Sequence, residues 1–365
     1  MSVFHSLQVK KLNRLTDKSV HVVLDVPKSL QTEFGFKAGQ YLTIKHQIDG
    51  EEIRRSYSIC DAEPPKKGLF KKKIKASEVS FAVKEVEDGK MSTFLNKQLK
   101  EGDSLMVMEP TGKFLLPKFG HDPMHYVFIA AGSGITPVIS QIKTVLQQSP
   151  EAEVILCFGN KAESEIMFKD ELEVLEKAFI NRFFVYHFWS SNPEEVKAPN
   201  VFNGRLKPST VYKLSEKHRR WDDVHYFVCG PEEMIAKMEE YLPLRDVTKD
   251  QIHIEYFTKS KSEAQSNEAV SSDDVFETTI IFEGLEHKVD VPANTSILDV
   301  ALKAGIHAPY SCQSGVCCTC QAKGSFGDFD TSECLSLSDD EIREGHVLTC
   351  VGKVVRDNVV INYDE

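Results

Sequence analysis

Four cysteines near the end of the sequence constrain the fold more strongly than any other feature. Three of them follow the spacing C-x4-C-x2-C, and 29 residues separate the third from the fourth. This is the ligand spacing of a plant-type 2Fe-2S cluster. Because such a cluster needs four thiolates, a folded domain must bring the distant cysteine to the loop that carries the other three. The four predicted ligands are Cys312, Cys317, Cys320 and Cys350.

A zinc site or a group of disulfides agrees less well with these cysteines. A zinc ribbon would show two C-x2-C pairs, and disulfides are rare in intracellular proteins. The loop 310–317 contains small residues that let backbone amides turn toward sulfur, and the segment 346–350 is expected to be partly extended. The pattern therefore predicts an electron carrier.

The length and composition agree with a multi-domain enzyme. At roughly 100 to 200 residues per domain, a chain of 365 residues predicts two or three cores, and its 22 Phe can fill them. The first residues lack the basic and apolar regions of a signal peptide. The longest apolar run, 126–131, is too short to cross a bilayer. We therefore expect a cytoplasmic location and no membrane partner.

Charge is unevenly distributed along the chain. Residues 274–365 contain 16 Asp or Glu against 6 Lys or Arg, a net charge of −10 out of the −11 of the whole chain. Such an acidic region is unsuited to nucleic acid and suits encounter with a basic protein surface. Solubility alone would also account for this charge.

A stretch with almost no apolar residues, 259–274, cannot bury a core and is expected to be a flexible linker. The chain then divides into a front part and an acidic tail that carries the cysteine motif. The predicted domains are 1–118, 119–258 and 275–365.

The first domain is expected to be a small antiparallel β-barrel. Its segments 19–26, 36–44 and 105–108 are short, rich in β-forming residues and interrupted by Gly, Pro and Asp, which is typical of such barrels.

Two motifs in this barrel could bind a diphosphate. One is Arg55-Ser56-Tyr57-Ser58, an R-x-Y-S motif, and the other is the run 89–93, which opens an expected helix over 93–99. An arginine fork suits a diphosphate, and backbone amides at a helix N-terminus suit an anion. Taken alone, R-x-Y-S is a common combination on a strand.

The second domain is expected to alternate strands with helices. The buried-strand run 126–131 is followed by Gly132-Ser133-Gly134-Ile135-Thr136-Pro137 and an amphipathic stretch, 138–146. A strand, a glycine-rich turn and a helix form a nucleotide crevice. Pro137 stands where the third glycine of the usual fingerprint would be, and Pro is tolerated in a first helical turn. A glycine-rich turn can also be purely structural.

Further strands are expected at 154–158, 183–188 and 226–228, with helices such as 163–178 between them, which predicts a parallel sheet. The last strand ends in Cys229-Gly230-Pro231-Glu232, at the kind of position where an open α/β sheet places its ligand.

The combination of R-x-Y-S, the Gly132–Pro137 turn, C-G-P and Glu255-Tyr256-Phe257 resembles the ferredoxin-NADP reductase family. The resemblance implies that the first domain binds FAD and the second binds NADPH or NADH. It implies contacts to flavin from Arg55 at the pyrophosphate, Tyr57 at the isoalloxazine and Ser58 at its N5 edge. The other residues that it implies for cofactor binding are Gly89, Lys90, Met91, Ser92, Thr93, Gly132, Gly134, Thr136, Pro137, Gly230, Pro231 and Phe257.

The same resemblance implies catalytic roles for Ser58, Cys229 and Glu255. Cys229 would lie near the path of the hydride, although a small buried cysteine at a strand end would account for its presence equally well. Phe257 would cover the flavin where the nicotinamide enters. FAD rather than FMN, and the choice between NADPH and NADH, are not decided by the residues themselves.

The order of flavin barrel, nucleotide domain and plant-type ferredoxin domain of β-grasp fold resembles the reductase components of bacterial multicomponent oxygenases. The most similar group is that of the phenylacetyl-CoA epoxidase reductase subunits, through the segments 4–7, 50–60, 159–172 and 345–350. The resemblance implies that electrons pass from NAD(P)H through FAD and the 2Fe-2S cluster to an oxygenase. A desaturase or hybrid-cluster protein as the electron acceptor, and a redox-sensing module without turnover, are the alternatives.

Two features depart from the pattern of the family. A basic insertion, 66–75, could dock an acidic partner or could be a solvated loop. Two further cysteines, Cys318 and Cys334, could be sensitive to oxidation or could be small residues in packed positions, and their spacing argues against a ligand role.

Overall fold

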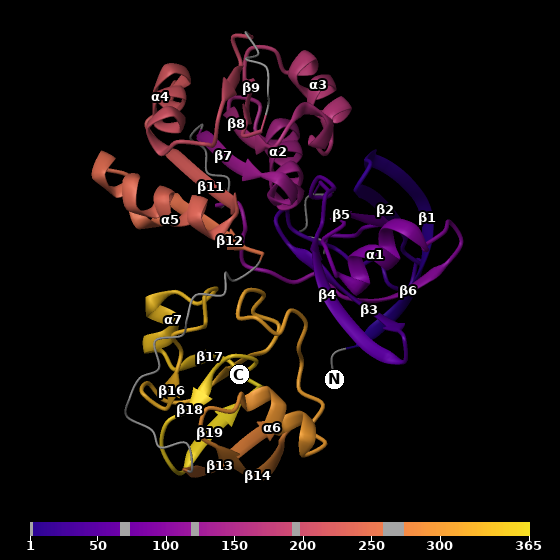
Figure 1. The fold of residues 1–365 in the computed structure, drawn as a ribbon, viewed down its shortest axis with the longest axis vertical. Coiled ribbons are helices and arrows are strands. Elements are labelled where there is room, and N and C mark those ends of the chain that lie inside the picture. Colours follow the sequence, from indigo (N-terminus) through magenta and orange to yellow (C-terminus); the bar gives the residue numbers. More distant parts are fainter. Residues whose placement is uncertain (1–2, 66–73, 118–123, 192–197, 258–273) are drawn as a thin grey trace. The chain divides into compact units, whose positions relative to one another are not determined.

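The computed structural model describes residues 3–65, 74–117, 124–191, 198–257 and 274–365 (Figure 1). Most of the predicted basic insertion and almost all of the predicted linker lie outside these residues. The chain divides into two compact units. The larger unit comprises Phe4–Ile53 and Tyr57–Glu255, and the smaller one consists mainly of Tyr256–Glu365.

The first sheet of the larger unit has six strands in the order β4-β3-β6-β1-β2-β5. Strand β1 pairs antiparallel with β2 and β6, as do β2 with β5 and β3 with β6. A bridge between Ile59 and Phe81 joins the chain that follows β4 to β5, at the other end of the strand order. This confirms the expected barrel. The strands are β1 (Phe4–Thr16), β2 (Ser19–Asp25), β3 (Tyr41–Ile48), β4 (Glu51–Ser58), β5 (Glu78–Lys84) and β6 (Ser104–Met108).

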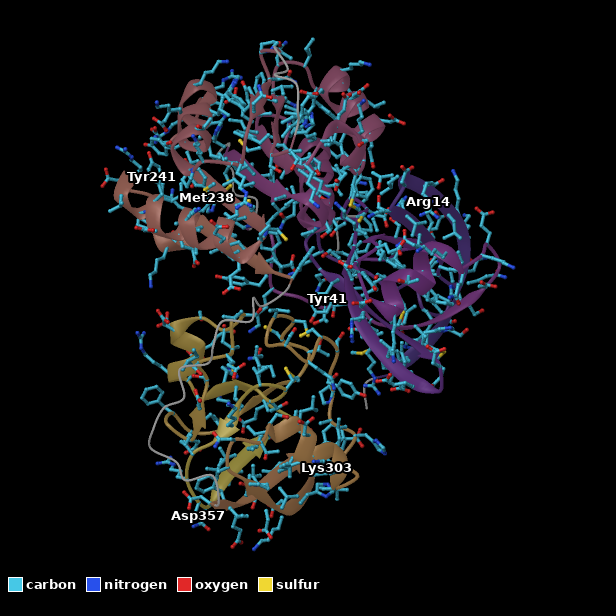
Figure 2. All side chains as sticks on the ribbon, viewed as in Figure 1. Arg14, Tyr41, Met238, Tyr241, Lys303 and Asp357 are labelled. Atoms are coloured by element: carbon cyan, nitrogen blue, oxygen red, sulfur yellow. The ribbon has the colours of Figure 1, made fainter. Side chains whose placement is uncertain are left out.

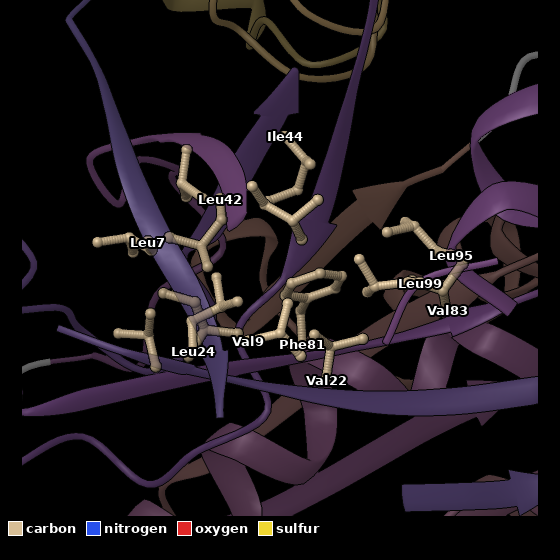
Figure 3. Close-up of a cluster of buried hydrophobic side chains, with 14 of the residues drawn as sticks. Leu7, Val9, Val22, Leu24, Leu42, Ile44, Phe81, Val83, Leu95 and Leu99 are labelled. Carbon is tan, nitrogen blue, oxygen red and sulfur yellow. The ribbon is translucent and has the colours of Figure 1, made fainter. Parts of the chain in front are cut away.

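The barrel core forms because alternate residues of each strand point inward. In β2, Val20, Val22 and Leu24 are buried, and His21 and Val23 between them are more exposed. Phe81 of β5 packs among them, together with leucines of β1 and β3 (Figure 3). The barrel is therefore a rigid support for the residues at its strand ends.

Helix α1 (Lys90–Lys97) begins three residues before the predicted start of 93. Gly89 has extended backbone angles and is the N-cap, so the amide of Thr93 already donates to the Gly89 carbonyl at 2.9 Å. The other end is held by Arg14 of β1, labelled in Figure 2, which donates to the backbone oxygen of Asn96 at 2.7 Å. A cation is favourable at a helix C-terminus.

The second sheet has the order β10-β9-β8-β7-β11-β12. Strand β7 pairs parallel with both β8 and β11, and β9 pairs parallel with β8 and β10. The chain order therefore reverses on either side of β7, which is where open α/β sheets bind ligands. The strands are β7 (His125–Ala131), β8 (Glu153–Asn160), β9 (Phe183–Trp189), β10 (Val201–Asn203), β11 (Val224–Gly230) and β12 (Ile252–Tyr256).

The predicted helix 163–178 is interrupted. A 3-10 turn, η2 (Glu163–Glu165), is followed by Phe168 in the left-handed region (φ +59°), and only then does α3 (Lys169–Ala178) begin. Phe168 is buried, so packing imposes a conformation that ends helical continuity. The other helical segments here are η1 (Gly132–Gly134), α2 (Ile135–Gln148), α4 (Pro208–His218), α5 (Glu232–Tyr241), η3 (Pro243–Arg245) and η4 (Lys249–Gln251).

The smaller unit has the mixed sheet expected for the ferredoxin domain, in the order β14-β13-β19-β15-β17. Strand β13 pairs antiparallel with β14 and parallel with β19. Its elements are β13 (Val275–Phe282), β14 (Leu285–Pro292), α6 (Ile297–Lys303), β15 (Gln321–Lys323), β16 (Phe329–Asp330), α7 (Asp339–Arg343), β17 (His346–Leu348), β18 (Lys353–Val354) and β19 (Val359–Asn362).

The core of this unit lies between α6 and the sheet, where Ile280, Leu298, Val347 and Ile361 are almost completely buried. Across the described residues of both units, no helix has the length and apolar character needed to span a bilayer.

Candidate functional site

The R-x-Y-S motif occupies the end of β4. Tyr57 is half-buried and its ring stacks on Phe81, with ring centroids 5.4 Å apart and planes 20° from parallel. This contact fixes one face of the Tyr57 ring. Ser58 is buried at 4 % exposure, whereas Arg55 is exposed and donates from Nη1 to the Arg54 carbonyl at 2.7 Å. An exposed guanidinium beside a fixed aromatic ring suits a flavin with its diphosphate.

The start of α1 has the features of an anion site. No side chain caps it, so its first-turn amides have no intrahelical acceptor and can bind a phosphate group. A Cβ atom at Gly89 would lie 2.4 Å from both Ser92 Oγ and Val86 Cγ2. Ser92 Oγ donates to the Gly89 carbonyl at 3.0 Å. The Lys90 ammonium pairs with Glu51 at 2.6 Å. Lys90 can therefore serve the anion site through its backbone amide more readily than through its side-chain charge.

The glycine turn and the C-G-P motif are adjacent because β7 and β11 are neighbours, with Ala130 beside Cys229. A Cβ atom at Gly134 would lie only 2.1 Å from the Cys229 carbonyl oxygen. Gly132 has φ +54° and open space where a Cβ would be. Although they lie almost a hundred residues apart in the sequence, the two motifs therefore meet at one edge of the sheet, the carboxyl ends of β7 and β11. At Gly132, no side chain among the described residues covers the backbone of this edge.

The residues that flank this edge are packed. Thr136 is buried and donates from Oγ1 to the Ser133 carbonyl at 3.0 Å, and Pro137 is buried in the first turn of α2. A Cβ atom at Gly230 would lie 2.6 Å from Met234 Cε. Pro231 is the N-cap of α5. Small or cyclic residues at these points let a nucleotide approach the backbone.

Cys229 is completely buried, and the partly buried Glu255 lies near enough to act on it electrostatically. Burial raises the pKa of the Cys229 thiol well above its usual range, and the Glu255 carboxyl raises it further. Burial also raises the pKa of Glu255 to about 8. Its Oε2 atom is buried without a hydrogen-bond partner among the described residues. Both groups therefore hold their protons at neutral pH. Phe257, two residues further on, is half-buried.

The four predicted cluster ligands come together in the smaller unit. The Cys312 sulfur is within hydrogen-bonding reach of those of Cys317 and Cys350, and the Cys320 sulfur is within reach of that of Cys350. Hydrogen bonds from the Cys317 and Cys350 thiols lower the pKa of Cys312, and one from Cys350 lowers that of Cys320. The same contacts raise the pKa of the Cys317 and Cys350 thiols. Two of the four sulfur atoms are therefore ready to act as thiolates, the form that binds iron, and the other two lose their protons on binding.

Within the part of the chain that the structure describes, no group of three or more His, Cys, Asp or Glu side chains is arranged around a single metal ion. A 2Fe-2S centre takes two protein ligands per iron. The Cys312–Cys317 and Cys320–Cys350 contacts are consistent with that requirement, and the Cys312–Cys350 contact joins them.

The loop that carries three of these cysteines depends on left-handed backbone. Gln313, Gly315 and Cys318 have φ values of 54°, 74° and 51°, and a Cβ atom at Gly315 would lie 2.2 Å from the Glu333 carbonyl oxygen. These turns aim the amide of Ser314 at Cys312 Sγ, 3.4 Å away. Backbone amides that point at sulfur stabilise thiolates.

Thr349 brings the fourth ligand to this loop. Its amide and its Oγ1 both donate to the Cys320 carbonyl, at 3.2 and 2.9 Å. Thr349 is completely buried. Cys350, the next residue, is thereby held beside Cys320 across a long separation in sequence.

The two further cysteines have packing partners. Cys334 is buried, accepts from the Leu348 amide at 3.4 Å, and has its pKa raised to about 12 by burial. Cys318 is half-buried and donates to the Ser336 carbonyl at 3.4 Å. Both contacts favour a structural role over a redox role.

Sequence reasoning missed Asn160, the last residue of β8. It is 7 % exposed, and neither Oδ1 nor Nδ2 has a hydrogen-bond partner among the described residues. Buried amides without partners are rare, and this one lies at the carboxyl end of a strand adjacent to β7. The sequence signal that could have identified Asn160 is a single polar residue at the end of an otherwise apolar strand.

Three family models match the chain in succession. They are an oxidoreductase FAD-binding domain over residues 6–115, an oxidoreductase NAD-binding domain over 128–240 and a 2Fe-2S iron-sulfur cluster binding domain over 280–355. Together they confirm FAD, a nicotinamide nucleotide and a 2Fe-2S cluster as the cofactors.

Relatives match over almost the whole chain. One subunit of the 1,2-phenylacetyl-CoA epoxidase of Escherichia coli (strain K12) is 33 % identical, with 100 % of this chain and 99 % of the relative covered. The ferredoxin reductase component of 3-ketosteroid-9-alpha-monooxygenase from Rhodococcus rhodochrous is 27 % identical, with 94 % and 92 % covered.

Solved structures show the same fold. Phthalate dioxygenase reductase has a TM-score of 0.59 at 22 % identity, with 98 % of each chain covered. An intact type IV self-sufficient cytochrome P450 monooxygenase has a TM-score of 0.70 at 21 % identity, and this chain spans 41 % of its length. The chain therefore belongs to the family of oxygenase reductase components, in which electrons pass from NAD(P)H through FAD to a 2Fe-2S cluster carried on the same polypeptide.

Proposed function

We propose that this reductase delivers electrons to an oxygenase such as a phenylacetyl-CoA epoxidase. The observation that carries the proposal is the 33 % identity to a subunit of the E. coli epoxidase over the full length of both chains. The acidic charge of residues 274–365 supports docking of the cluster domain on a basic partner surface. A desaturase or a hybrid-cluster protein as acceptor is the alternative that the experiment below separates.

The proposed domains are 1–118 for FAD, 119–258 for the nucleotide and 275–365 for the cluster, with 259–274 as the linker. In the first domain, Arg55 and the run 89–93 bind the pyrophosphate. The amides of Lys90, Met91 and Ser92 do this, because those of Gly89 and Thr93 already donate to backbone carbonyls. Support comes from the exposed guanidinium and from the uncapped start of α1.

The isoalloxazine is assigned to Tyr57 and Ser58. The Tyr57 ring, stacked on Phe81, orients the flavin ring, and the buried Ser58 lies at the strand end beside it. When bound, the flavin accepts a hydride and passes electrons singly to the cluster.

The nicotinamide nucleotide is assigned to the backbone edge formed by Gly132, Gly134 and Gly230, flanked by Thr136, Pro137 and Pro231. The close approach of Gly134 to the Cys229 carbonyl supports this assignment. Cys229 and Glu255 remain protonated and exclude charge and water from the reacting face. Phe257 is assigned to the entry of the nicotinamide.

The cluster is assigned to Cys312, Cys317, Cys320 and Cys350, and its chemistry there is one-electron transfer. The pairwise approach of their sulfur atoms supports the assignment. We also propose a cytoplasmic location, where thiols stay reduced. All nine cysteines lie among the described residues and all are free.

The test is an anaerobic titration followed by reconstitution. The purified protein is titrated with NADPH and then with NADH, while flavin bleaching and the electron paramagnetic resonance signal of the reduced cluster are followed. The oxygenase components of a phenylacetyl-CoA epoxidase are then added with their CoA substrate. Nucleotide consumption coupled to substrate oxidation supports the proposed acceptor. A reduced cluster that the oxygenase leaves reduced would assign the protein to another acceptor.

A further inference from the structure

Helix α2 has a polar face that no cofactor motif explains. Ser140, Gln141, Thr144 and Gln148 fall within an arc of about 100° on the helix, because successive residues are about 100° apart. Ser140, Gln141 and Thr144 are completely buried. Buried polar side chains require partners. Here the barrel supplies a partner to each, while Thr144 Oγ1 also donates to the Ser140 carbonyl and Gln141 Oε1 has no partner among the described residues.

Four hydrogen bonds join this face to the barrel backbone. Ser140 Oγ donates to the Asp61 carbonyl at 2.6 Å, and Thr144 Oγ1 accepts from the Glu63 amide at 2.8 Å. Gln148 Nε2 donates to the Glu63 carbonyl at 2.9 Å, and Gln141 Nε2 donates to the backbone oxygen at residue 114 at 2.7 Å. Every barrel partner is a backbone group, so the bonds fix the path of the chain.

The barrel segment 59–63, which receives three of these four bonds, is itself held in place. It starts directly after Ser58, and the Cys60 amide donates to the Ser80 carbonyl at 2.9 Å. The Asp61 carboxylate accepts from the Ser80 amide at 2.5 Å and from Ser80 Oγ at 2.7 Å. Residues 59–63 are therefore held by the barrel on one side and by α2 on the other.

The two ends of this link are the two cofactor sites. On the barrel side, Asp61 follows Ser58 of the R-x-Y-S strand by three residues. On the helix side, Ser140 follows Thr136, in the first turn of α2, by one helical turn. Residues 59–63 and helix α2 thus connect the strand proposed to bind flavin to the turn proposed to bind the nicotinamide.

We infer that Ser140, Gln141 and Thr144 are positioning residues for hydride transfer, holding the glycine turn at a set distance from the end of β4. The inference rests on the proposed function of these two sites. Hydride transfer needs reacting atoms about 3 to 3.5 Å apart, and a displacement of about 1 Å can cost about a hundredfold in rate. Side chains that touch neither cofactor can thus control the rate.

The test compares Thr144→Val with Thr144→Ser in the full-length holoprotein. Valine matches threonine in shape but leaves the Glu63 amide without its acceptor, whereas serine keeps the hydroxyl. Gln147→Ala is the matched control, because Gln147 is an exposed residue of the same helix. Flavin absorbance first checks that each variant retains FAD.

Two quantities are measured for each variant. Stopped-flow bleaching by NADPH and by NADH gives the limiting rate of flavin reduction and the half-saturating concentration. Hydrogen–deuterium exchange of the peptide that contains Glu63, with and without flavin, reports on the hydrogen bond independently of activity.

We expect Thr144→Val to lower the limiting rate at least tenfold, to change the half-saturating concentration less than twofold, and to speed exchange at Glu63 with or without flavin. Thr144→Ser and Gln147→Ala should stay within twofold of the unmodified protein. If Thr144→Val does not fold, Ser140→Ala gives the same comparison through the Asp61 carbonyl.

Faster exchange at Glu63 with an unchanged limiting rate would overturn the inference, because the bonds would then be only structural. A rise in the half-saturating nucleotide concentration of Thr144→Val without a loss of its limiting rate would also overturn the inference. An unmodified protein that neither nucleotide bleaches would instead refute the proposed function of the two sites.

Discussion

The nucleotide edge and the cysteine loop hold their cofactors by opposite means. At the edge, Gly132 leaves open space beside the backbone, and the buried Gly134 lets the turn after β7 pack against the Cys229 strand end. In the cysteine loop, three sulfur atoms bind together with that of Cys350, and left-handed residues such as Gln313 and Gly315 shape the loop. We therefore expect the nucleotide edge to be sensitive to substitutions that add a side-chain atom, and the cluster site to substitutions that remove a sulfur atom.

The largest expected effect is the removal of one cluster ligand. Cys320→Ser should abolish the electron paramagnetic resonance signal of the reduced cluster and all cluster-dependent electron exit, because one iron loses a thiolate. Oxidation of NAD(P)H by an artificial two-electron acceptor should continue, since the larger unit keeps its core. Iron analysis and the two assays check this. Loss of both activities together would contradict a division of labour between the units.

The converse change is Gly134→Ala, which adds one methyl group. Its Cβ would lie 2.1 Å from the Cys229 carbonyl oxygen, so the turn and the C-G-P strand end must separate. We expect a loss of about 1 to 3 kcal/mol in unfolding free energy and at least a tenfold rise in the half-saturating nucleotide concentration. Urea unfolding and flavin bleaching measure the two.

Gly50→Ala is the control for this change. Gly50 has φ +79° whereas Gly134 has φ −59°, so Gly50→Ala carries a backbone cost that Gly134→Ala lacks, and a Cβ atom at Gly50 would meet nothing within 4 Å. It should show the backbone cost alone and normal nucleotide binding. Equal effects of the two substitutions on nucleotide binding would show that the close approach at Gly134 is unimportant.

A smaller effect is expected from the carboxyl group beside Cys229. The pKa of Glu255 is raised to about 8 in the folded state, so the folded protein binds a proton that the unfolded chain releases above about pH 4.3. This stabilises the fold at low pH, and the contribution is lost as the pH rises toward 8.

Glu255→Gln should remove this pH dependence, because glutamine does not ionise. We expect the difference in unfolding free energy between the variant and the unmodified protein to change by on the order of 3 kcal/mol between about pH 5.5 and 8.5. Buried histidines with lowered pKa values, such as His125 and His253, titrate in both proteins and cancel in the comparison. A difference that is constant with pH would contradict a protonated Glu255.

The smallest effect should come from Thr349, which positions a ligand without binding the cluster. Thr349→Val removes one of its two hydrogen bonds to the Cys320 carbonyl, at a cost of about 1 kcal/mol. We expect the cluster to assemble with a modest shift in its resonance signal, and Thr349→Ser to behave as the unmodified protein. Failure of Thr349→Val to bind iron would mean that the side-chain bond is needed to bring Cys350 into place.

Local patterns in the sequence predicted much of the fold. The strand run 126–131 and the glycine turn after it became β7 and η1, and the predicted domain order agrees with the three family models. These features could be predicted because a few neighbouring residues determine whether a segment forms a strand or a turn. The predicted helix 163–178 was wrong at its start, because burial of Phe168 in a left-handed conformation is a tertiary effect.

The candidate sites divide in the same way. Cysteine spacing and the R-x-Y-S motif were visible in the sequence, because ligand chemistry requires particular residue types at short spacings. The unpartnered amide of Asn160 and the polar face of α2 were not, since a polar residue in a helix or at a strand end is ordinary until its partners are known.

The sequence by itself determined the four candidate cluster ligands and the order of the candidate cofactor motifs along the chain, through residue types at short spacings. Only the tertiary structure decided that the Gly134 turn meets the Cys229 strand end, that Glu255 keeps its proton, and that Thr349 brings Cys350 to Cys320. The physical reason is that steric exclusion, desolvation and hydrogen-bond pairing depend on distances between residues far apart in the chain, which no local pattern records.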